Sequence, residues 1–441
     1  MRRLQWAAVC LGSALSLFVS LAIAKIWFVV GSEEGHWVHQ YALFFDVRAI
    51  WIAMLVAALA AALLALPESI IRRREWLIVL TWFVAALALQ ALLRSLTGIS
   101  FEQNLRSVHG YSFYVVTQRY PARVILSDFE RLRPELPLHA QSNMPGKLIF
   151  MYALELITNR ADVLPWLITA LSNFGGVLMY MFVRDFFGNS QVALYSLVLY
   201  LFLPAKLYFL PGLNTVTPVI VLLCVVLLMR WLRTSRMVYA ALLGAALYEL
   251  AFFDPGALSM GLLMAVLMAH ALWRRDIAWR TLLLQGSMAV GVFAATYLVV
   301  LIWFRFDLFT TARQLGIAAA GFNDRWHRPY KIWVRQNLLN FFFGVGICQT
   351  VLVAVAPWRR RITDPIVILC VTITAILLVV DAIGISRGEV VRLWIFLACF
   401  FQIPAAYVCA RLESRAAMMV VIATTVIQAA LGTLMIGFIY A

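Results

Sequence analysis

Three charged residues open a late apolar run in this 441-residue chain, where charge is costly unless it is paired or bound. Arg387, Glu389 and Arg392 lie within six positions of one another, at the start of a segment hydrophobic enough to cross a membrane. Ionisable residues at such a boundary mark a binding site by default. Asp381 closes the preceding apolar run, so simple pairing with Arg387 is an equal alternative. A phosphate is the natural ligand for paired guanidinium groups.

Two polar segments carry further cations, and the first ends in a proline-glycine turn. Residues 95–146 and the lysine that follows include Glu102, Asp128, His139, Asn143, Gly146 and Lys147. Residues 305–337 alternate aromatic side chains with cations, among them Arg328 and Lys331. A Pro-Gly entry to a helix exposes backbone N–H groups that suit a phosphate, although it is also ordinary turn chemistry. A second polar turn, at residues 209–218, contains Asn214.

Composition places these segments at the surface of a membrane. Hydrophobic residues make up 64% of the chain and charged residues 13%, and the apolar residues form runs of the length that spans a bilayer. We predict an all-α bundle of about thirteen transmembrane helices forming a single domain, residues 1–441. Residues 1–94 give three spans, 95–160 a large external loop with amphipathic surface helices, and 161–441 the remaining spans. The predicted spans are residues 6–30, 48–66, 77–94, 163–183, 190–205, 213–230, 237–253, 257–273, 281–304, 338–356, 365–381, 391–409 and 416–440.

The arginines between spans predict the orientation. Short arginine-bearing connections fall on one side, which the positive-inside rule assigns to the cytoplasm; they include Arg2, Arg3, Arg72, Arg73, Arg74, Arg184, Arg230, Arg233, Arg236, Arg359, Arg360 and Arg361. The N-terminus is then cytoplasmic and the C-terminus extracytoplasmic. The apolar stretch 147–158 is too short to cross comfortably, and we predict a short helix that dips into the outer leaflet. The net charge of +15 follows from this orientation, and no nucleic-acid partner is predicted.

The cations of residues 95–147 and 305–337 lie on the wrong side for this rule. Long loops are translocated regardless of charge, which is one explanation. The other is an anionic ligand on that face, such as a lipid phosphate. No metal or other cofactor is predicted, because His36, His39 and Asp46 share a loop at spacings that fit no zinc pattern. The six cysteines all fall in apolar runs and indicate buried side chains without disulfides.

The layout resembles the GT-C superfamily of integral-membrane glycosyltransferases, in particular bacterial members similar to protein mannosyltransferases and aminoarabinose transferases. Residues 138–146 resemble the His-Pro-Pro-Gly helix entry of such proteins, with Asn143-Met144 in place of the His-Pro pair. Residues 178–188, with Tyr180, Arg184 and Phe186-Phe187-Gly188, resemble the end of their next span. Residues 209–217 resemble an external turn in which an aspartate is common where this chain has Asn214. Residues 387–396 resemble a late-span signature.

The resemblance implies a substrate and an inverting transfer of a hexosyl or pentosyl group. The donor is a polyprenyl-phosphate-linked sugar and the acceptor a lipid, glycan or protein, at the extracytoplasmic face of a bacterial inner membrane. Glu102 is the first choice for the general base, Asp128 the second, and His139 orients donor or base. Phosphate binding is assigned to Arg387, Arg392, Lys331, Arg328 and Lys147, with support from Asn143, Gly146, Asn214 and Glu389. A lipid or solute transporter, and an inactive GT-C-like binding protein, are the alternatives.

Overall fold

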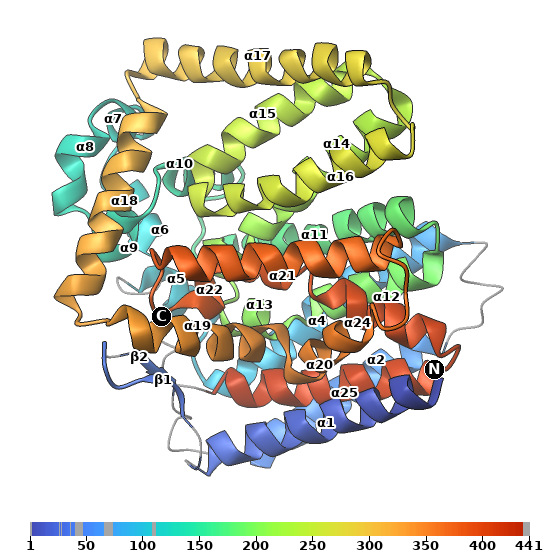
Figure 1. Cartoon of the computed structure of the whole chain (residues 1–441). Helices are drawn as coiled ribbons and strands as arrows, with labels where there is room; N and C mark the ends of the chain where they lie inside the picture. The colour runs from blue at the N-terminus through green and yellow to red at the C-terminus, as the bar shows by residue number, and fades with distance from the viewer. Residues whose placement is uncertain are drawn as a thin grey trace.

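The computed structural model describes residues 2–25, 27, 29–35, 37–39, 47–65, 74–107 and 112–434. His36, Asp46, Arg72 and Arg73, which the sequence singled out, lie outside these ranges. Most of the described chain is helical, and the helices run roughly alongside one another across Figure 1. The chain is therefore an all-α polytopic protein, as predicted.

Nine helices in the described part of the chain are long and apolar enough to cross a membrane, or ten if one bent pair counts as a single span. They are α1 (Arg2–Ala24), α4 (Glu75–Arg94) with η1 (Ser95–Thr97), α11 (Leu164–Phe187), α12 (Ser190–Leu201) with α13 (Pro204–Tyr208), α14 (Thr217–Thr234) with η3 (Leu213–Thr215), α16 (Gly261–Trp273) with η4 (Pro255–Met260), α17 (Trp279–Phe304), α21 (Pro365–Ile383) and α25 (Arg415–Gly432).

Shorter or broken apolar helices account for the other predicted spans. They are α2 (Val47–Leu64), α15 (Met237–Phe253), the series α22 (Val390–Leu393), α23 (Ile395–Ala398) and α24 (Gln402–Arg411), and the pair α19 (Tyr330–Val345) and α20 (Ile347–Val355). Where the structure describes them, the thirteen predicted segments thus lie mostly on helix. The segment 338–356 is not one straight span, however, because α19 and α20 meet at 98°. Gly346 lies at this break with φ +106°, a conformation that glycine adopts without strain.

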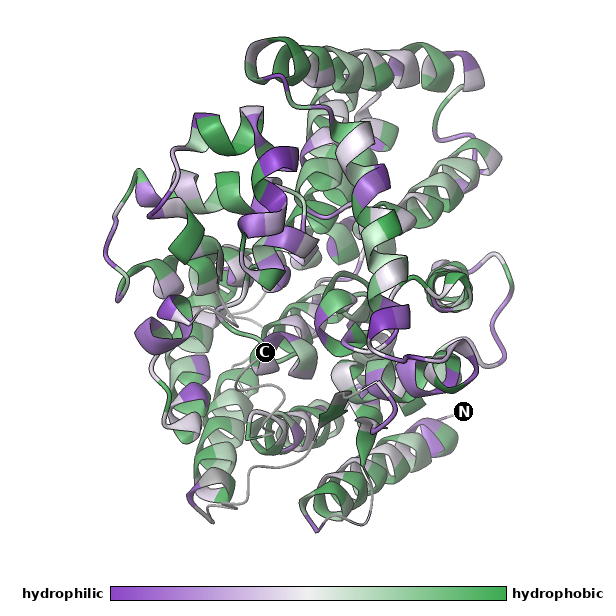
Figure 2. Ribbon diagram, turned by 90° about the vertical axis from the view of Figure 1, so that its left-hand side faces the viewer, coloured by the Kyte–Doolittle hydropathy of each residue, from purple (hydrophilic) through white to green (hydrophobic). Residues whose placement is uncertain are grey.

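One end of the bundle carries a layer of short helices. Residues 95–146 form α5 (Phe101–Arg106), α6 (Ser112–Thr117), α7 (Ala122–Ser127), α8 (Phe129–Leu132), η2 (Arg133–Glu135) and α9 (Leu138–Ser142), followed by α10 (Gly146–Glu155). The second polar segment forms α18 (Leu308–Arg325), which crosses the same end in Figure 1. Purple hydrophilic segments gather on short helices when the molecule is viewed toward this end (Figure 2). The two cation-rich polar segments, residues 95–147 and 305–337, therefore share one face, opposite the start of α1.

A small hairpin was not predicted from the sequence. Strands β1 (Val30–Ser32) and β2 (Trp37–His39) pair antiparallel, and β1 packs against α19. The hairpin follows α1 directly, so it brings the N-terminal part of the chain to the end of the bundle that carries the surface helices.

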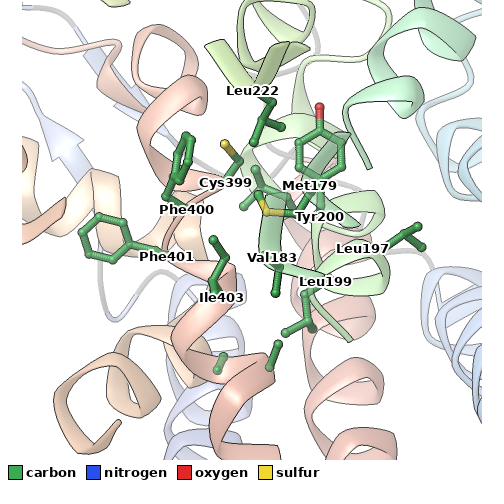
Figure 3. Close-up of a cluster of buried hydrophobic side chains, with 14 of the residues drawn as sticks. Met179, Val183, Leu197, Leu199, Tyr200, Leu222, Cys399, Phe400, Phe401 and Ile403 are labelled. Carbon is green, nitrogen blue, oxygen red and sulfur yellow. The ribbon is translucent and has the colours of Figure 1, made fainter. Parts of the chain in front are cut away.

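The core is built around α12, in which every residue from Val192 to Leu201 is buried. It packs against α11 and α24, and α11 packs against α14. Figure 3 shows the apolar side chains that meet here, among them Met179, Leu222 and Phe400. Cys399 lies in this core, whereas Cys10 is exposed on α1, contrary to the prediction that all six cysteines are buried.

Two helices of the upper half approach unusually closely, at a glycine. A Cβ on Gly244 of α15 would lie 2.1 Å from the carbonyl oxygen of Ala289 in α17. Small residues allow such backbone contact between membrane helices. Gly291 of α17 has open space around it and provides a matched control.

We expect Gly244→Ala to destabilise the protein by about 1–3 kcal/mol, because the new methyl forces α15 and α17 apart. Gly291→Ala adds the same methyl to an exposed position and leaves stability unchanged or slightly higher. Thermal unfolding of the purified protein in detergent measures both. Equal unfolding temperatures for the two variants would contradict this packing.

Candidate functional site: an arginine pocket at one end of the bundle

A cavity of about 340 Å³ opens where three distant parts of the chain meet. The η2–α9 region, α18 and the connection from α21 to α22 supply its walls. Five arginines line it against a single carboxylate, Glu389. The polar lining residues are Arg133, His139, Gln141, Ser142, Asn143, Asn323, Arg325, Arg328, Ser386, Arg387, Glu389 and Arg392. The predicted residues His139, Asn143, Arg328, Arg387, Glu389 and Arg392 thus come together.

Glu389 is held between two guanidinium groups. A terminal nitrogen (Nη2) of Arg392 donates a short hydrogen bond to Glu389 Oε2, and Nη2 of Arg328 lies 3.5 Å from Glu389 Oε1. The side chains of Arg328 and Glu389 are 5% and 15% exposed. Charges this far out of water need such partners. The carboxylate therefore offsets part of the arginine charge, but one carboxylate leaves the pocket strongly cationic.

Arg328 and Arg387 also fix each other through their backbones. Arg328 Nη1 donates to the carbonyl oxygen of Arg387 at 2.6 Å, and Arg387 Nη1 donates to that of Arg328 at 2.9 Å. Arg328 Nε donates to the carbonyl oxygen of Gly35, in the turn between β1 and β2, at 3.2 Å. The hairpin, the α18–α19 junction and the α21–α22 connection are therefore joined at one side chain.

Asn337 holds the loop that carries Glu389. Its amide nitrogen donates to Asp381 Oδ1 at 3.0 Å and to the Ser386 carbonyl, while its amide oxygen accepts the Gly388 N–H. Gly388 and Glu389 both have positive φ, +79° and +58°. The glycine adopts this conformation freely, whereas the glutamate is strained by it. Asp381 thus bonds Asn337, and the alternative in which it pairs with Arg387 is wrong.

His139 connects the polar segment 95–146 to this arginine group. Its Nε2 lies 3.3 Å from Nη1 of Arg392. The Asn143 amide donates to the His139 carbonyl at 2.8 Å, which closes the short helix α9. His139 is therefore placed to orient Arg392 within the pocket.

Lys147 lies directly behind the pocket and is only 1% exposed. Its Nζ donates to Asn143 Oδ1 at 2.7 Å and to Asn214 Oδ1 at 2.8 Å, and lies 3.9 Å from Asp254 Oδ2. Burial lowers the pKa of Lys147 to about 8, and the nearby Arg392 acts in the same direction. Lys147 is not among the residues that line the cavity, so it supports the pocket from within.

Gly146 allows α10 to sit close enough for these contacts. A Cβ at this position would lie 2.2 Å from the Phe252 carbonyl oxygen at the end of α15. The backbones of α10 and α15 therefore touch, which brings Lys147 beside Phe253 and Asp254.

Three predicted residues lie away from the pocket. Glu102 pairs with Arg106 at 2.9 Å and lines a separate cavity of about 310 Å³ with Arg94 and Asp162. Asp128 pairs with Arg131 at 3.3 Å. Lys331 is exposed on α19 and does not line the pocket.

Two polar residues inside the structure were not predicted from the sequence to have buried polar contacts. Asp254 directly precedes Pro255-Gly256, a sequence typical of a turn, and is not among the predicted site residues, yet it accepts a hydrogen bond from Thr217 at 3.0 Å and faces Lys147. Lys206 was placed between two spans, yet it is fully buried in α13 and donates to Asn173, which also bonds Gln90. A lysine two positions after a helix-starting Pro204, amid apolar residues, was the available signal for the second.

Comparison with known proteins adds no relative. No protein-family model matches the chain, and no curated protein sequence matches it. Among the described residues, no group of three or more histidines, cysteines, aspartates or glutamates is arranged to hold a metal ion. The chemistry of the site therefore has to be argued from its arginines and their partners.

The buried Lys147 makes stability depend on pH. Its pKa of about 8 in the folded chain lies below the ordinary value of 10.5, so the folded state binds fewer protons between these pH values and becomes more stable as pH rises. We expect the wild type to gain unfolding temperature relative to Lys147→Met and Lys147→Gln between pH 7.5 and about 10. Neither the methionine nor the glutamine side chain at position 147 titrates in this range. A difference that stays flat or falls with pH would contradict the burial of this ammonium group.

Proposed function

We propose that the chain is a membrane glycosyltransferase of the GT-C type that uses a polyprenyl-phosphate-linked sugar. The observation that carries the proposal is the pocket in which five arginines face a single carboxylate. Guanidinium groups bind phosphate through parallel N–H donors, and in a partly buried site these contacts are stronger than in water. In this proposal Arg328, Arg387 and Arg392 hold the donor phosphate, and Lys147 with Asn143 and Asn214 supports them.

The charges at the other end of the bundle support this assignment, because carboxylates accompany the arginines there. Arg184 pairs with Glu75 at 2.9 Å, and Arg230 and Arg233 each approach Asp185 within 3.1 Å. We propose that this end is cytoplasmic and that the pocket opens on the extracytoplasmic side of a bacterial inner membrane. Thirteen spans, with α19 and α20 as one broken span, give this topology.

Sugar transfer needs one bond made, one bond broken and one proton accepted. The acceptor hydroxyl oxygen attacks the anomeric carbon, the carbon–oxygen bond to the phosphate breaks, and polyprenyl phosphate leaves with its charge held by the arginines. A carboxylate takes the hydroxyl proton. We place this role at Glu389, which a bound phosphate releases by competing for Arg328 and Arg392. The assignment of Glu102 or Asp128 stays a prediction, decided by the same assay.

Removing a pocket arginine tests donor binding. We expect Arg392→Gln and Arg328→Gln each to weaken undecaprenyl phosphate binding by about 10- to 150-fold, since a hydrogen bond to a charged group contributes about 1.5–3 kcal/mol. Arg313→Gln, which changes an exposed arginine of α18 outside the pocket, provides the control. Binding of the lipid to purified protein in nanodiscs measures all three. If the pocket variants and the Arg313→Gln control bound the lipid with equal affinity, the phosphate site and the proposed function would both be contradicted.

Glutamine variants test the proton acceptor. We expect Glu389→Gln to lower sugar transfer by at least about 100-fold, while donor binding stays equal or tightens because a competing carboxylate is gone. Glu102→Gln and Asp128→Asn should keep transfer. If instead Glu102→Gln abolishes transfer with binding intact, the base lies at the second cavity, although the phosphate site stands.

The buried group of Lys206, Asn173 and Gln90 favours transport as the second candidate function. Polar residues inside a bundle are expected along a transport path. Flux of a solute or lipid across vesicles that Lys206→Met abolishes, without any sugar transfer by the wild type, would support transport over catalysis.

A further inference from the structure

An apolar groove of about 620 Å³ lies on the other side of α10 from the arginine pocket. Residues of α7, α10, α14, α15 and α17 line it, and these are Leu126, Ile149, Leu223, Leu227, Leu242, Ala245, Ala246, Tyr248, Glu249, Phe252, Thr296, Val300 and Phe304. Gln285 and Ala289 are the buried residues of α17, and about half of the others are exposed, so one side of this helix faces the surroundings of the bundle. In a bilayer those surroundings are lipid chains, and the groove is open to them.

Glu249 is the charged residue in this apolar lining. Its side chain is exposed, and the described part of the chain gives it no hydrogen bond or ion pair. It lies four residues, about 6 Å, from Phe253 at the outer end of α15. An unpaired carboxyl group at this depth is costly unless a ligand supplies its partner. The missing partner is a hydrogen-bond donor, and a cation suits it best.

Tyr248 is a second polar group without a partner. The residue is 3% exposed, and its hydroxyl is buried with no hydrogen bond to the described residues. Its ring is fixed by stacking on Phe252 and by an edge contact with Phe293, at 6.0 and 5.6 Å between centroids. This buried hydroxyl belongs to the residue next to Glu249 in the chain, and the other polar residue of the wall, Thr296, already donates to the Val292 carbonyl.

Two arginines flank the outer end of the groove. Arg123 lies three residues before Leu126, on the same face of α7, and Arg305 directly follows Phe304. Both are exposed, and within the described ranges neither forms an ion pair. Cations at the outer rim and a carboxyl group below them complement a head group that carries both signs of charge.

We propose that the groove binds a zwitterionic phospholipid with a primary ammonium head group. The hydrocarbon chains lie along α14, α15 and α17, the phosphate contacts Arg123 and Arg305, and the ammonium group donates to Glu249 beside Tyr248. This site is separate from the arginine pocket and does not depend on the proposed glycosyl transfer.

Phosphatidylethanolamine and phosphatidylcholine provide the test, because their head groups differ in that only the first carries N–H donors. Native mass spectrometry of the detergent-purified protein titrated with each lipid measures their affinities. We expect the wild type to prefer phosphatidylethanolamine by roughly tenfold. Glu249→Gln should abolish the preference, Tyr248→Phe should reduce it, and Glu135→Gln, an exposed loop control, should keep it.

Cross-linking of the wild type keeps the test independent of variant folding. Phosphatidylethanolamine with a photoreactive chain should label peptides that contain residues 242–252 and 296–304. Equal affinity for the two lipids, a preference that survives Glu249→Gln, or labelling spread evenly over the helices would each overturn the proposal. The proposal would also be overturned if undecaprenyl phosphate, added to the Arg392→Gln variant, abolished phosphatidylethanolamine labelling of these peptides. None of these outcomes bears on whether the arginine pocket binds a lipid phosphate.

Discussion

The position of Glu389 between Arg328 and Arg392 organises the whole outer end of the molecule. Arg328 reaches the turn of the N-terminal hairpin and the backbone of Arg387, and Arg392 reaches His139 in the first external loop. Segments separated by up to about three hundred residues thus meet at one carboxylate. Guanidinium groups placed so close would repel one another without it. The strained backbone of Glu389 is maintained because these contacts over-determine it.

A second buried group extends this arrangement inward. Lys147 joins Asn143 of the first loop to Asn214 of the turn before α14, and Asp254 after α15 faces it. Neither asparagine carries charge, so Asp254 is the one carboxylate of the described residues that pairs with the ammonium group, from 3.9 Å. Burial therefore outweighs the attraction and lowers the pKa of Lys147. The lysine organises three chain segments at the cost of an incompletely compensated charge.

Much of the fold followed from the sequence, because a bilayer permits few solutions. In the described part of the chain the long apolar runs are helical, and two cations of residues 305–337, Arg325 and Arg328, do meet Arg387 and Arg392. The break at Gly346 was not predicted, since glycines within an apolar run, here Gly344 and Gly346, do not by themselves reveal a bend. The positions of the charged residues in the sequence also gave no reason to place Glu102 away from the pocket residues. Both lie in polar segments at one end of the bundle, and only the packing of α5 beside α11, with Phe101 against Trp166, places Glu102 elsewhere.

Asp254 is the opposite case, a residue that contacts the site although its sequence context does not indicate it. In the sequence it is the first residue of a proline-glycine turn, and nothing local distinguishes it from a solvated aspartate. Its role arises because Gly146 lets α10 touch the end of α15, a contact between residues about a hundred positions apart. Long-range contacts of this kind leave no periodic signal in either segment.

The short helix α10 separates the two candidate ligand sites. Lys147 and Ile149 are two positions apart, about 200° around a helix, so the lysine faces the polar cluster while the isoleucine lines the apolar groove. Gly146 fixes the start of the helix against α15, and Phe252, whose carbonyl it meets, also lines the groove. The groove is thus lined by the same two helices that position Lys147 and Asp254, on faces that point away from the polar cluster.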